Sequence, residues 1–250
     1  MDSPIAVLPA GEPPGFPQCP TCPYRLMGPA WICVACASKT LEAIAPRACP
    51  VCSQRLENDS PCRNSLCRER NRRIERIDAI AYHSGALQDK IQSYKYEGKT
   101  GWSLIFGRLL VGWLEAHAEG DPPDLIVANP TYIGPGQPGP GHVEGVIRSA
   151  AVADYDGRWA FDASAPAAIK KTKPTEKSAG KSLAEKRAAA AALRQVLDVP
   201  DPARTRGQGI LVFDDVCTTG YQLNAVADCL LDQGQAARVR ALALARAPWQ

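Results

Sequence analysis

The chain has 250 residues, of which 45% are hydrophobic, and it carries a formal net charge of +3 at pH 7. This length suits one large or two modest domains with a buried core, and so small a charge does not by itself indicate nucleic-acid binding. No apolar stretch reaches the length of a membrane-spanning helix, and the first residues lack the pattern of a secretory signal. We therefore expect a cytoplasmic protein without membrane insertion, whose ten cysteines are reduced thiols or metal ligands rather than disulfides.

Cysteine pairs follow a leader over residues 1–18, whose five prolines predict an irregular and mobile segment. Three pairs have the spacing C-x2-C and the last has C-x4-C; the eight residues are Cys19, Cys22, Cys33, Cys36, Cys49, Cys52, Cys62 and Cys67. A C-x2-C turn directs two thiolates at one ion, and two such turns complete a tetrahedron around Zn²⁺. We therefore predict two closed, structural zinc sites in a module over residues 19–73, where the metal supplies the folding free energy that a small core cannot.

Two groupings of these eight cysteines are compatible with their spacing. The short gaps favour the sequential grouping, in which the first four cysteines bind one ion and the last four bind the other. In the cross-braced alternative, the first pair shares an ion with the third. Iron–sulfur clusters and redox dithiols are the alternatives to zinc.

A basic run, Arg-Glu-Arg-Asn-Arg-Arg-Ile-Glu-Arg, follows at residues 68–76. Beside zinc-binding turns it could contact nucleic-acid phosphates. It could equally be a solvated connector whose charges Glu69 and Glu75 compensate. We favour the connector, because one short charge run is weak evidence of a nucleic-acid site.

From residue 77 onward, strand and helix patterns alternate, which predicts a parallel sheet with right-handed crossovers in a domain over residues 74–250. Strands are expected at about 77–82, 124–130, 167–169, 210–213 and 239–245. Helices are expected from about residue 87 to a stop at Gly98, and at about 102–117, 143–151, 182–197 and 221–233. Ser182 and Glu185 have the spacing of a capping box at the start of the fourth helix. His142 could be a base in the ligand pocket, but we favour a helix-start residue.

Residues 170–181 contain five lysines and little that is hydrophobic, so this segment is not expected to pack. It is either a solvated linker or a mobile lid whose cations cover an anionic ligand. We favour the lid, because long loops within ordered domains are often functional.

The most informative stretch is residues 210–220, Ile-Leu-Val-Phe-Asp-Asp-Val-Cys-Thr-Thr-Gly. Its apolar half predicts a buried strand, and Asp214 and Asp215 stand at the carboxyl end, where parallel sheets bind ligands. The loop that ends at Gly220 leads into a helix, whose N-terminus presents N–H groups to a phosphate. The carboxylates could accept hydrogen bonds from sugar hydroxyls or hold Mg²⁺ through water. This chemistry favours a bound ribose phosphate with a metal; the plainer alternative is a turn that caps a helix.

This stretch resembles the signature with which type I phosphoribosyltransferases bind 5-phosphoribosyl-1-pyrophosphate (PRPP). The resemblance implies that Asp214 and Asp215 hold the ribose hydroxyls and that the following loop binds the 5′-phosphate. The loop comprises Val216, Cys217, Thr218, Thr219 and Gly220. Tyr221 departs from the pattern, which more often has a small residue or lysine there. The implied fold is a type I phosphoribosyltransferase-like α/β fold, with a parallel sheet flanked by helices and a small N-terminal cysteine-rich zinc-binding module.

A second element, Tyr-Lys-Tyr-Glu-Gly-Lys at residues 94–99, resembles the Lys-Tyr-x-Gly-Lys element of the ComF/GntX family of competence-related proteins. With the cysteine pairs and the PRPP signature, this resemblance extends from about Cys19 to the end of the chain. It implies a pyrophosphate contact near Asn129 and a flexible loop that closes over PRPP. The lysines that would screen pyrophosphate from this loop are Lys171, Lys173 and Lys181.

The resemblance implies a protein that binds PRPP with Mg²⁺ and transfers the phosphoribosyl group to an unknown acceptor. Residues 128–131 and 141–144 depart from the family's pattern, so the acceptor side of the site stays open. The alternative is a non-catalytic factor for DNA uptake that binds single-stranded DNA or a nucleotide. The sequence does not define the oligomeric state.

Overall fold

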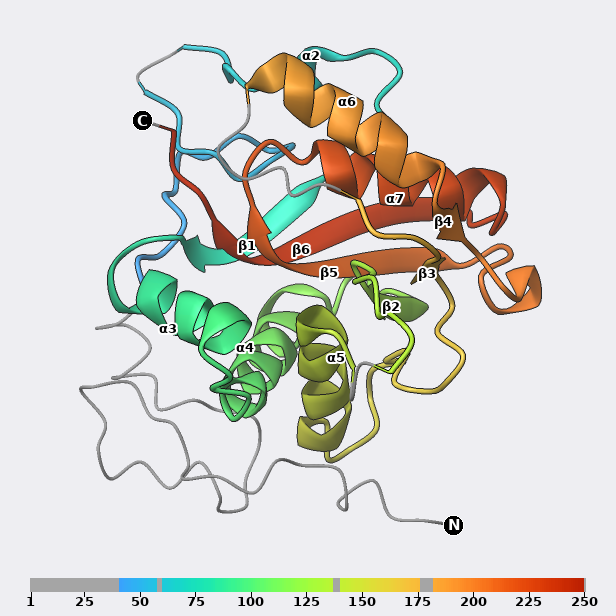
Figure 1. Cartoon of the computed structure of the whole chain (residues 1–250). Coiled ribbons are helices and arrows are strands. Elements are labelled where there is room, and N and C mark those ends of the chain that lie inside the picture. Colours follow the sequence, from blue (N-terminus) through green and yellow to red (C-terminus); the bar gives the residue numbers. More distant parts are fainter. Residues whose placement is uncertain (1–40, 58–59, 137–139, 176–181, 250) are drawn as a thin grey trace, which may run out of the picture.

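A parallel β-sheet forms the centre of the computed structural model, which describes residues 41–57, 60–136, 140–175 and 182–249 (Figure 1). The four strands are arranged in the order β1-β6-β5-β2. Their bounds are β1 (Ile77–Tyr82), β2 (Leu125–Ala128), β5 (Gly209–Cys217) and β6 (Arg238–Arg246). β5 and β6 are buried along almost their whole length, as their continuous apolar runs require, whereas the edge strand β1 alternates between buried and half-buried residues.

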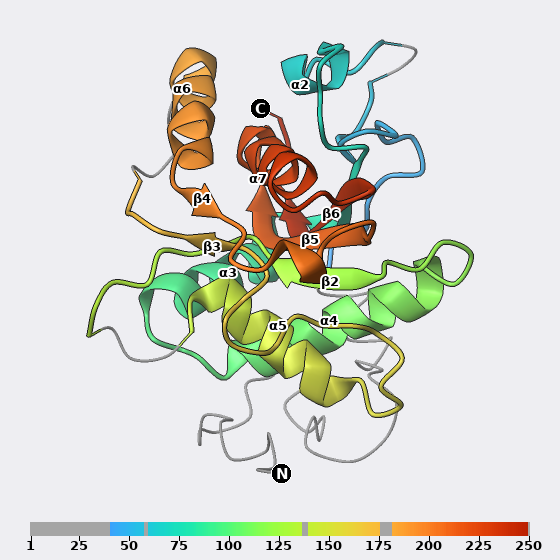
Figure 2. The ribbon, with the colours of Figure 1, turned by 90° about the vertical axis from the view of Figure 1, so that its right-hand side faces the viewer.

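Helices cover both faces of this sheet, so the predicted α/β class with a flanked parallel sheet is confirmed (Figure 2). One face packs against α3 (Gly85–Tyr96), α4 (Trp102–His117) and α5 (His142–Ala153). The other packs against α7 (Tyr221–Asp232), on which α6 (Leu183–Arg194) lies. The smaller elements are α2 (Ser65–Arg68), the 3-10 helix η2 (Pro202–Arg204), β3 (Lys170–Lys171) and β4 (Leu197–Asp198). No helix in these described ranges is both long and apolar enough to cross a bilayer.

Most predicted elements lie where they were expected, with differences at short strands and strand ends. The short strand expected at 167–169 is β3, slightly later in the chain, and it pairs antiparallel with β4. The helix expected to reach Leu197 ends at Arg194, because Leu197 pairs with Lys171. The strand expected to end before the carboxylates continues through them to Cys217, because β6 pairs with it as far as Arg246. The capping box is confirmed: the Ser182 N–H donates to Glu185 at 2.8 Å, and Ser182 Oγ accepts from the Glu185 N–H.

The described part of the cysteine-rich segment lies against this sheet. The N–H of Ile77 donates to the carbonyl of Val51 at 2.7 Å, and Ser53 Oγ donates to the Ile77 carbonyl at 3.0 Å. The N–H of Tyr82 donates to the carbonyl of Glu42 at 2.7 Å. These bonds hold the turns that carry the cysteines beside the edge strand.

Helices α4 and α5 approach closely at Gly107. A Cβ atom at this position would lie 2.6 Å from the Ala150 amide nitrogen and 2.8 Å from the Ser149 carbonyl carbon, which is backbone that cannot rotate away. Only a residue without a side chain allows these helices to pack at this distance.

We expect Gly107→Ala to destabilise the protein by about 1–3 kcal/mol, which is the usual cost of overpacking a core. This cost outweighs the ~1 kcal/mol by which alanine favours a helix over glycine. Urea unfolding followed by circular dichroism measures this change. Gly120→Ala is the matched control, because a Cβ atom at Gly120 meets nothing within 4 Å. Equal stability of the two variants would contradict the close packing.

Candidate metal centre and anion-binding loop

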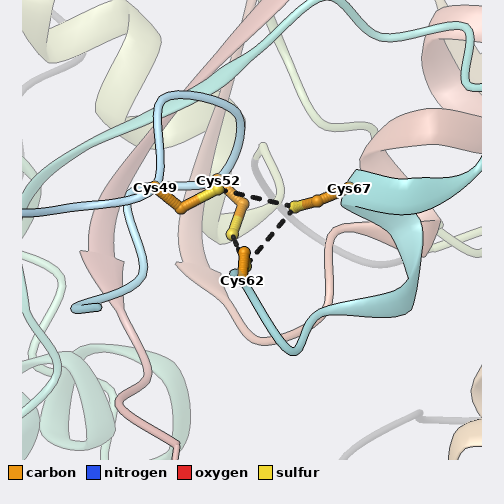
Figure 3. A group of neighbouring side chains, drawn as sticks. All are labelled: Cys49, Cys52, Cys62 and Cys67. Atoms are coloured by element: carbon orange, nitrogen blue, oxygen red, sulfur yellow. Dashed lines mark hydrogen bonds between the residues drawn. The ribbon is translucent and has the colours of Figure 1, made fainter. Parts of the chain in front are cut away.

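Four cysteines converge beside the sheet: Cys49, Cys52, Cys62 and Cys67 (Figure 3). Their Sγ atoms all lie within 4.8 Å of one another. The Sγ–Sγ distances include 3.8 Å between Cys49 and Cys67, 3.7 Å between Cys52 and Cys62, and 3.8 Å between Cys62 and Cys67. Four thiolates around one tetrahedral zinc, each about 2.3 Å from the ion, would be separated by about 3.8 Å. The cluster therefore fits a zinc ion.

Local hydrogen bonds explain how these cysteines are brought together. In the first turn, the N–H of Ser53 donates to the carbonyl of Cys49 at 2.9 Å, which curls the C-x2-C segment around the site. In the second, Asn64 caps α2 by accepting from the N–H of Leu66 at 3.3 Å, and Cys67 lies on that helical turn. This is the grouping that sequential pairing predicts for the last four cysteines. Cys19, Cys22, Cys33 and Cys36, like the predicted leader, lie outside the described residues.

The thiols of this cluster differ in pKa. A hydrogen bond with Cys67 and the charge of Arg246 outweigh burial and lower the pKa of Cys52 to about 4. Burial raises the pKa of Cys62 to about 11. The cluster thus offers a thiolate at neutral pH, while a metal ion that binds all four sulfurs must displace the remaining protons.

The loop over residues 217–220 joins β5 to α7 at the carboxyl edge of the sheet. The carbonyl groups of its first three residues are bound from one side: those of Cys217 and Thr218 accept hydrogen bonds from the Arg246 guanidinium, the first at 2.8 Å, and that of Thr219 accepts from Asn64 Nδ2 at 3.0 Å. A trans peptide places its N–H opposite its C=O. The N–H groups of residues 218–220 therefore point to the other side, and none of them donates to an acceptor in the described chain.

Gly220 closes this loop with a φ of +83°, in the left-handed region, directly before α7. A Cβ atom there would lie 2.4 Å from Ile77 Cδ1 and 3.0 Å from Leu66 Cδ2. The position therefore requires glycine for both its backbone angle and its packing. The N-terminus of the twelve-residue helix α7 adds its own free N–H groups and positive dipole end to those of the loop.

Asp214 and Asp215, both buried, stand just before this loop. Asp214 accepts hydrogen bonds from the Asn129 side chain and, at 3.0 Å, from the Asp215 N–H. Burial and the charge of Asp215 raise the pKa of Asp214. Burial acts to raise the pKa of Asp215 as well, but the hydrogen bond from His142 and the charge of Lys95 lower it overall. Asp215 is thus the carboxylate that keeps its negative charge, and Asp214 is the one that is more easily protonated.

Two basic side chains meet on Asp215 that sequence reasoning did not place there. Lys95 Nζ and His142 Nε2 each lie 2.8 Å from Asp215 Oδ2. His142 begins α5, as expected, and its carbonyl accepts a hydrogen bond from Tyr94 Oη at 2.6 Å. The only signal for Lys95 was its place in the Tyr-Lys-Tyr-Glu-Gly-Lys element; without that element it looked like a solvated helix end. For His142, the sequence offered a pocket base only as the less favoured alternative to a helix-start residue.

Of the other predicted site residues, some lie beside the carboxylates and others do not. The Asn129 N–H donates to the Phe213 carbonyl at 2.7 Å, so the exit of β2 lies beside the carboxylates. Lys171 lies in the β3–β4 ribbon, where burial lowers its pKa, and Lys173 follows it. Within the described chain, neither lysine forms an ion pair with Asp214 or Asp215. Lys181 lies outside the described residues.

Tyr221, the departure from the phosphate-loop pattern, faces away from the free N–H groups. Its hydroxyl lies 2.9 Å from Ser65 Oγ and from Arg187 Nε, and it donates to Glu69 Oε1 at 2.5 Å. The side chain therefore joins α7 to α2 and α6, and a larger residue here does not narrow the loop.

Comparisons with known proteins do not identify a family for this chain. No protein-family model matches the chain, and no curated protein shows a significant match. The family resemblance therefore rests on the motifs quoted above.

Proposed function

We propose that this protein binds PRPP, or a related ribose phosphate, with Mg²⁺ at the carboxyl end of β5. The observation that carries the proposal is the loop over residues 217–220: Arg246 and Asn64 bind the carbonyls of residues 217–219, so that the N–H groups of residues 218–220 point the opposite way and stay free, next to two buried carboxylates. Free N–H groups at a helix N-terminus form a site for a phosphate group. The adjacent carboxylates suit neutral hydroxyls, because a second anion would be repelled there.

The residues have separate tasks in this proposal. The N–H groups of the loop and of α7 bind the 5′-phosphate, and Asp214 and Asp215 accept hydrogen bonds from the ribose hydroxyls. Mg²⁺ bound with the ligand would supply positive charge at the pyrophosphate. Lys95 and His142 hold the Asp215 carboxylate in place and keep it charged.

The reaction proposed for this site is transfer of the phosphoribosyl group to an acceptor that is not yet identified. The bond between ribose C1 and the pyrophosphate oxygen breaks with its electron pair leaving on pyrophosphate, and an acceptor atom forms a new bond to C1. Such a step needs positioning and charge neutralisation rather than a protein nucleophile. The lysines of residues 170–181 are proposed to screen the pyrophosphate.

The alternative, single-stranded DNA binding through residues 68–76, has less support. Arg72 donates to the carbonyl of Cys67 at 3.1 Å, Arg73 contacts Asp228 at 3.1 Å, and Arg76 contacts Asp78 at 2.8 Å. These three guanidinium groups are occupied by the chain's own acceptors, whereas Arg68 and Arg70 of the same run are exposed.

The double substitution Asp214→Asn, Asp215→Asn tests the proposed function. We expect saturable binding of Mg²⁺–PRPP to the wild type in calorimetry, and at least about 100-fold weaker binding to the variant, because two charge-assisted hydrogen bonds of about 1.5–3 kcal/mol each are lost. Asp232→Asn is the matched control: this carboxylate lies at the far end of α7, where it pairs with Arg73 at the surface, so affinity should not change.

The proposal fails if the wild type shows no saturable binding, or if the double variant binds as the wild type does. The first outcome would direct attention to single-stranded DNA. There, affinity should fall steeply with salt if backbone phosphates are contacted.

A further inference from the structure

Arg246, the last residue of β6, is fully buried and lies between the cysteine cluster and the anion-binding loop. On one side, Nε donates to the carbonyl of Cys52 at 2.7 Å and Nη2 lies 3.7 Å from Cys52 Sγ. On the other, Nη1 donates to the carbonyls of Cys217 and Thr218. One guanidinium group therefore touches a metal-ligating residue and two consecutive peptides of the loop.

A buried guanidinium needs anionic or hydrogen-bonding partners, because its charge is costly away from water. Among the described residues, no carboxylate lies within ion-pair distance of Arg246. Its nearest acidic groups are thiols, chiefly Cys52 and Cys217. The position of this side chain thus depends on its contacts with Cys52 of the cysteine cluster.

Asn64 makes a second, independent link between the same two sites. This residue lies between Cys62 and Cys67 and is fully buried. Its Nδ2 donates to the Thr219 carbonyl at 3.0 Å, while its Oδ1 caps α2. Together, Arg246 and Asn64 bind the carbonyls of residues 217, 218 and 219, and so determine where the N–H groups of residues 218–220 point.

We propose that the cysteine metal centre controls the affinity of the anion-binding loop, with Arg246 and Asn64 as the positioning residues that connect them. This inference rests on the proposed function for its ligand, although the link itself is seen in the contacts. A metal ion that fixes Cys52, Cys62 and Cys67 also fixes both positioning residues and holds the loop ready for a phosphate. Loss of the ion frees the loop, whose carbonyls can then turn toward the ligand.

Such coupling acts in both directions. If metal raises the affinity for PRPP by some factor, PRPP must raise the affinity for metal by the same factor, and couplings of about 5- to 150-fold are common. We therefore expect that, at equilibrium, a higher concentration of a colorimetric chelator is needed to remove half of the zinc from the full-length protein when Mg²⁺–PRPP is bound.

The variant Arg246→Lys tests the link in the zinc-loaded, full-length chain. Lysine retains the charge but lacks the fork that reaches both sites at once. We expect zinc content to be retained and affinity for Mg²⁺–PRPP to fall about tenfold. Hydrogen exchange of the Ala247 and Asn224 amides, which donate to the carbonyls of Cys217 and Gly220 at the two ends of the loop, should become at least about tenfold faster.

Arg240→Lys is the matched control, since this arginine is a buried residue of the same strand whose guanidinium donates its hydrogen bonds to Asp121 within the described chain. This variant should leave exchange of those two amides and the affinity unchanged.

Asn64→Ala provides a second route that leaves Arg246 intact, and it decides the question if Arg246→Lys does not fold. Suppose that the wild-type protein binds PRPP. If a folded variant then shows the same hydrogen exchange and the same affinity as the wild type, the coupling is overturned. If the variant exchanges faster but the wild-type protein does not bind PRPP, the link between the two sites is upheld and the proposed ligand is refuted. The two failures are therefore distinguishable.

Discussion

Replacing Cys52 by serine is expected to lower the thermal unfolding midpoint by about 10 °C or more. Cys52 is fully buried, its sulfur lies 3.7 Å from that of Cys62, and a serine hydroxyl is a poor substitute for a zinc-binding thiolate. Metal binding supplies folding free energy in small cysteine-rich segments. The substitution also leaves the buried Arg246 facing a neutral group in place of a thiolate. Differential scanning calorimetry gives the midpoint, and elemental analysis of the purified chain should show one fewer zinc ion.

Cys229→Ser separates metal loss from the effect of placing a hydroxyl in the core. Cys229 is equally buried, but it lies in α7, where its thiol contacts Gln233 at 3.5 Å. We expect this variant to retain its full zinc content and to unfold within a few degrees of the wild type. If Cys52→Ser behaved in the same way, the cysteine cluster would not be a metal centre.

Replacing Asp214 by asparagine is expected to stabilise the unliganded protein at pH 8, on the order of 2 kcal/mol, and to have little effect near pH 4. Burial and the charge of Asp215 raise the pKa of Asp214 from 3.8 to about 7. A group whose pKa is raised on folding contributes most stability below its unfolded pKa, and this contribution is lost as the pH rises through the folded pKa. Asparagine is uncharged throughout, so the difference between variant and wild type should grow between about pH 4 and pH 8.

Asp215→Asn is expected to act in the opposite direction. The pKa of Asp215 is lowered on folding, because His142 and Lys95 together outweigh burial. Its carboxylate therefore contributes stability above its unfolded pKa, and the asparagine variant should be less stable than the wild type at pH 8. Urea unfolding at pH 4.5, 6 and 8 measures both effects. Equal destabilisation by the two variants at pH 8 would show that Asp214 is not under this electrostatic strain.

The opposite behaviour of these neighbouring carboxylates bears on the proposed function. A buried carboxylate that destabilises the empty protein is better accommodated once a ligand donates hydrogen bonds to it. Strongly perturbed acids of this kind occur at functional sites, where stability is sacrificed for binding. Asp214 accepts hydrogen bonds from Asn129 and the Asp215 N–H. A further hydrogen bond from a ribose hydroxyl should therefore stabilise its ionised form more than that of Asp215.

Long elements could be predicted from the sequence almost to the residue. The strand Ile77–Tyr82 and the helix Trp102–His117 have the bounds that their hydrophobic periodicity predicts. Short elements could not be placed as well: β3 is only two residues long, and it exists because β4, far along the chain, pairs with it. Periodicity is a local signal, and a two-residue strand has none.

The candidate site divides in the same way. The sequence alone determined the strand, the paired carboxylates, the glycine-ended loop and the spacing of the cysteines, because tight turns, metal ligation and left-handed backbone each require particular residues at short range. Tertiary structure alone decided that Lys95 and His142 meet on Asp215, and that Arg246 and Asn64 bind the back of the loop. These partners lie on separate elements, and any lysine, histidine, arginine or asparagine could have satisfied the same local pattern. Only the packing of helices and turns around the carboxyl edge of the sheet brings those four side chains to the site.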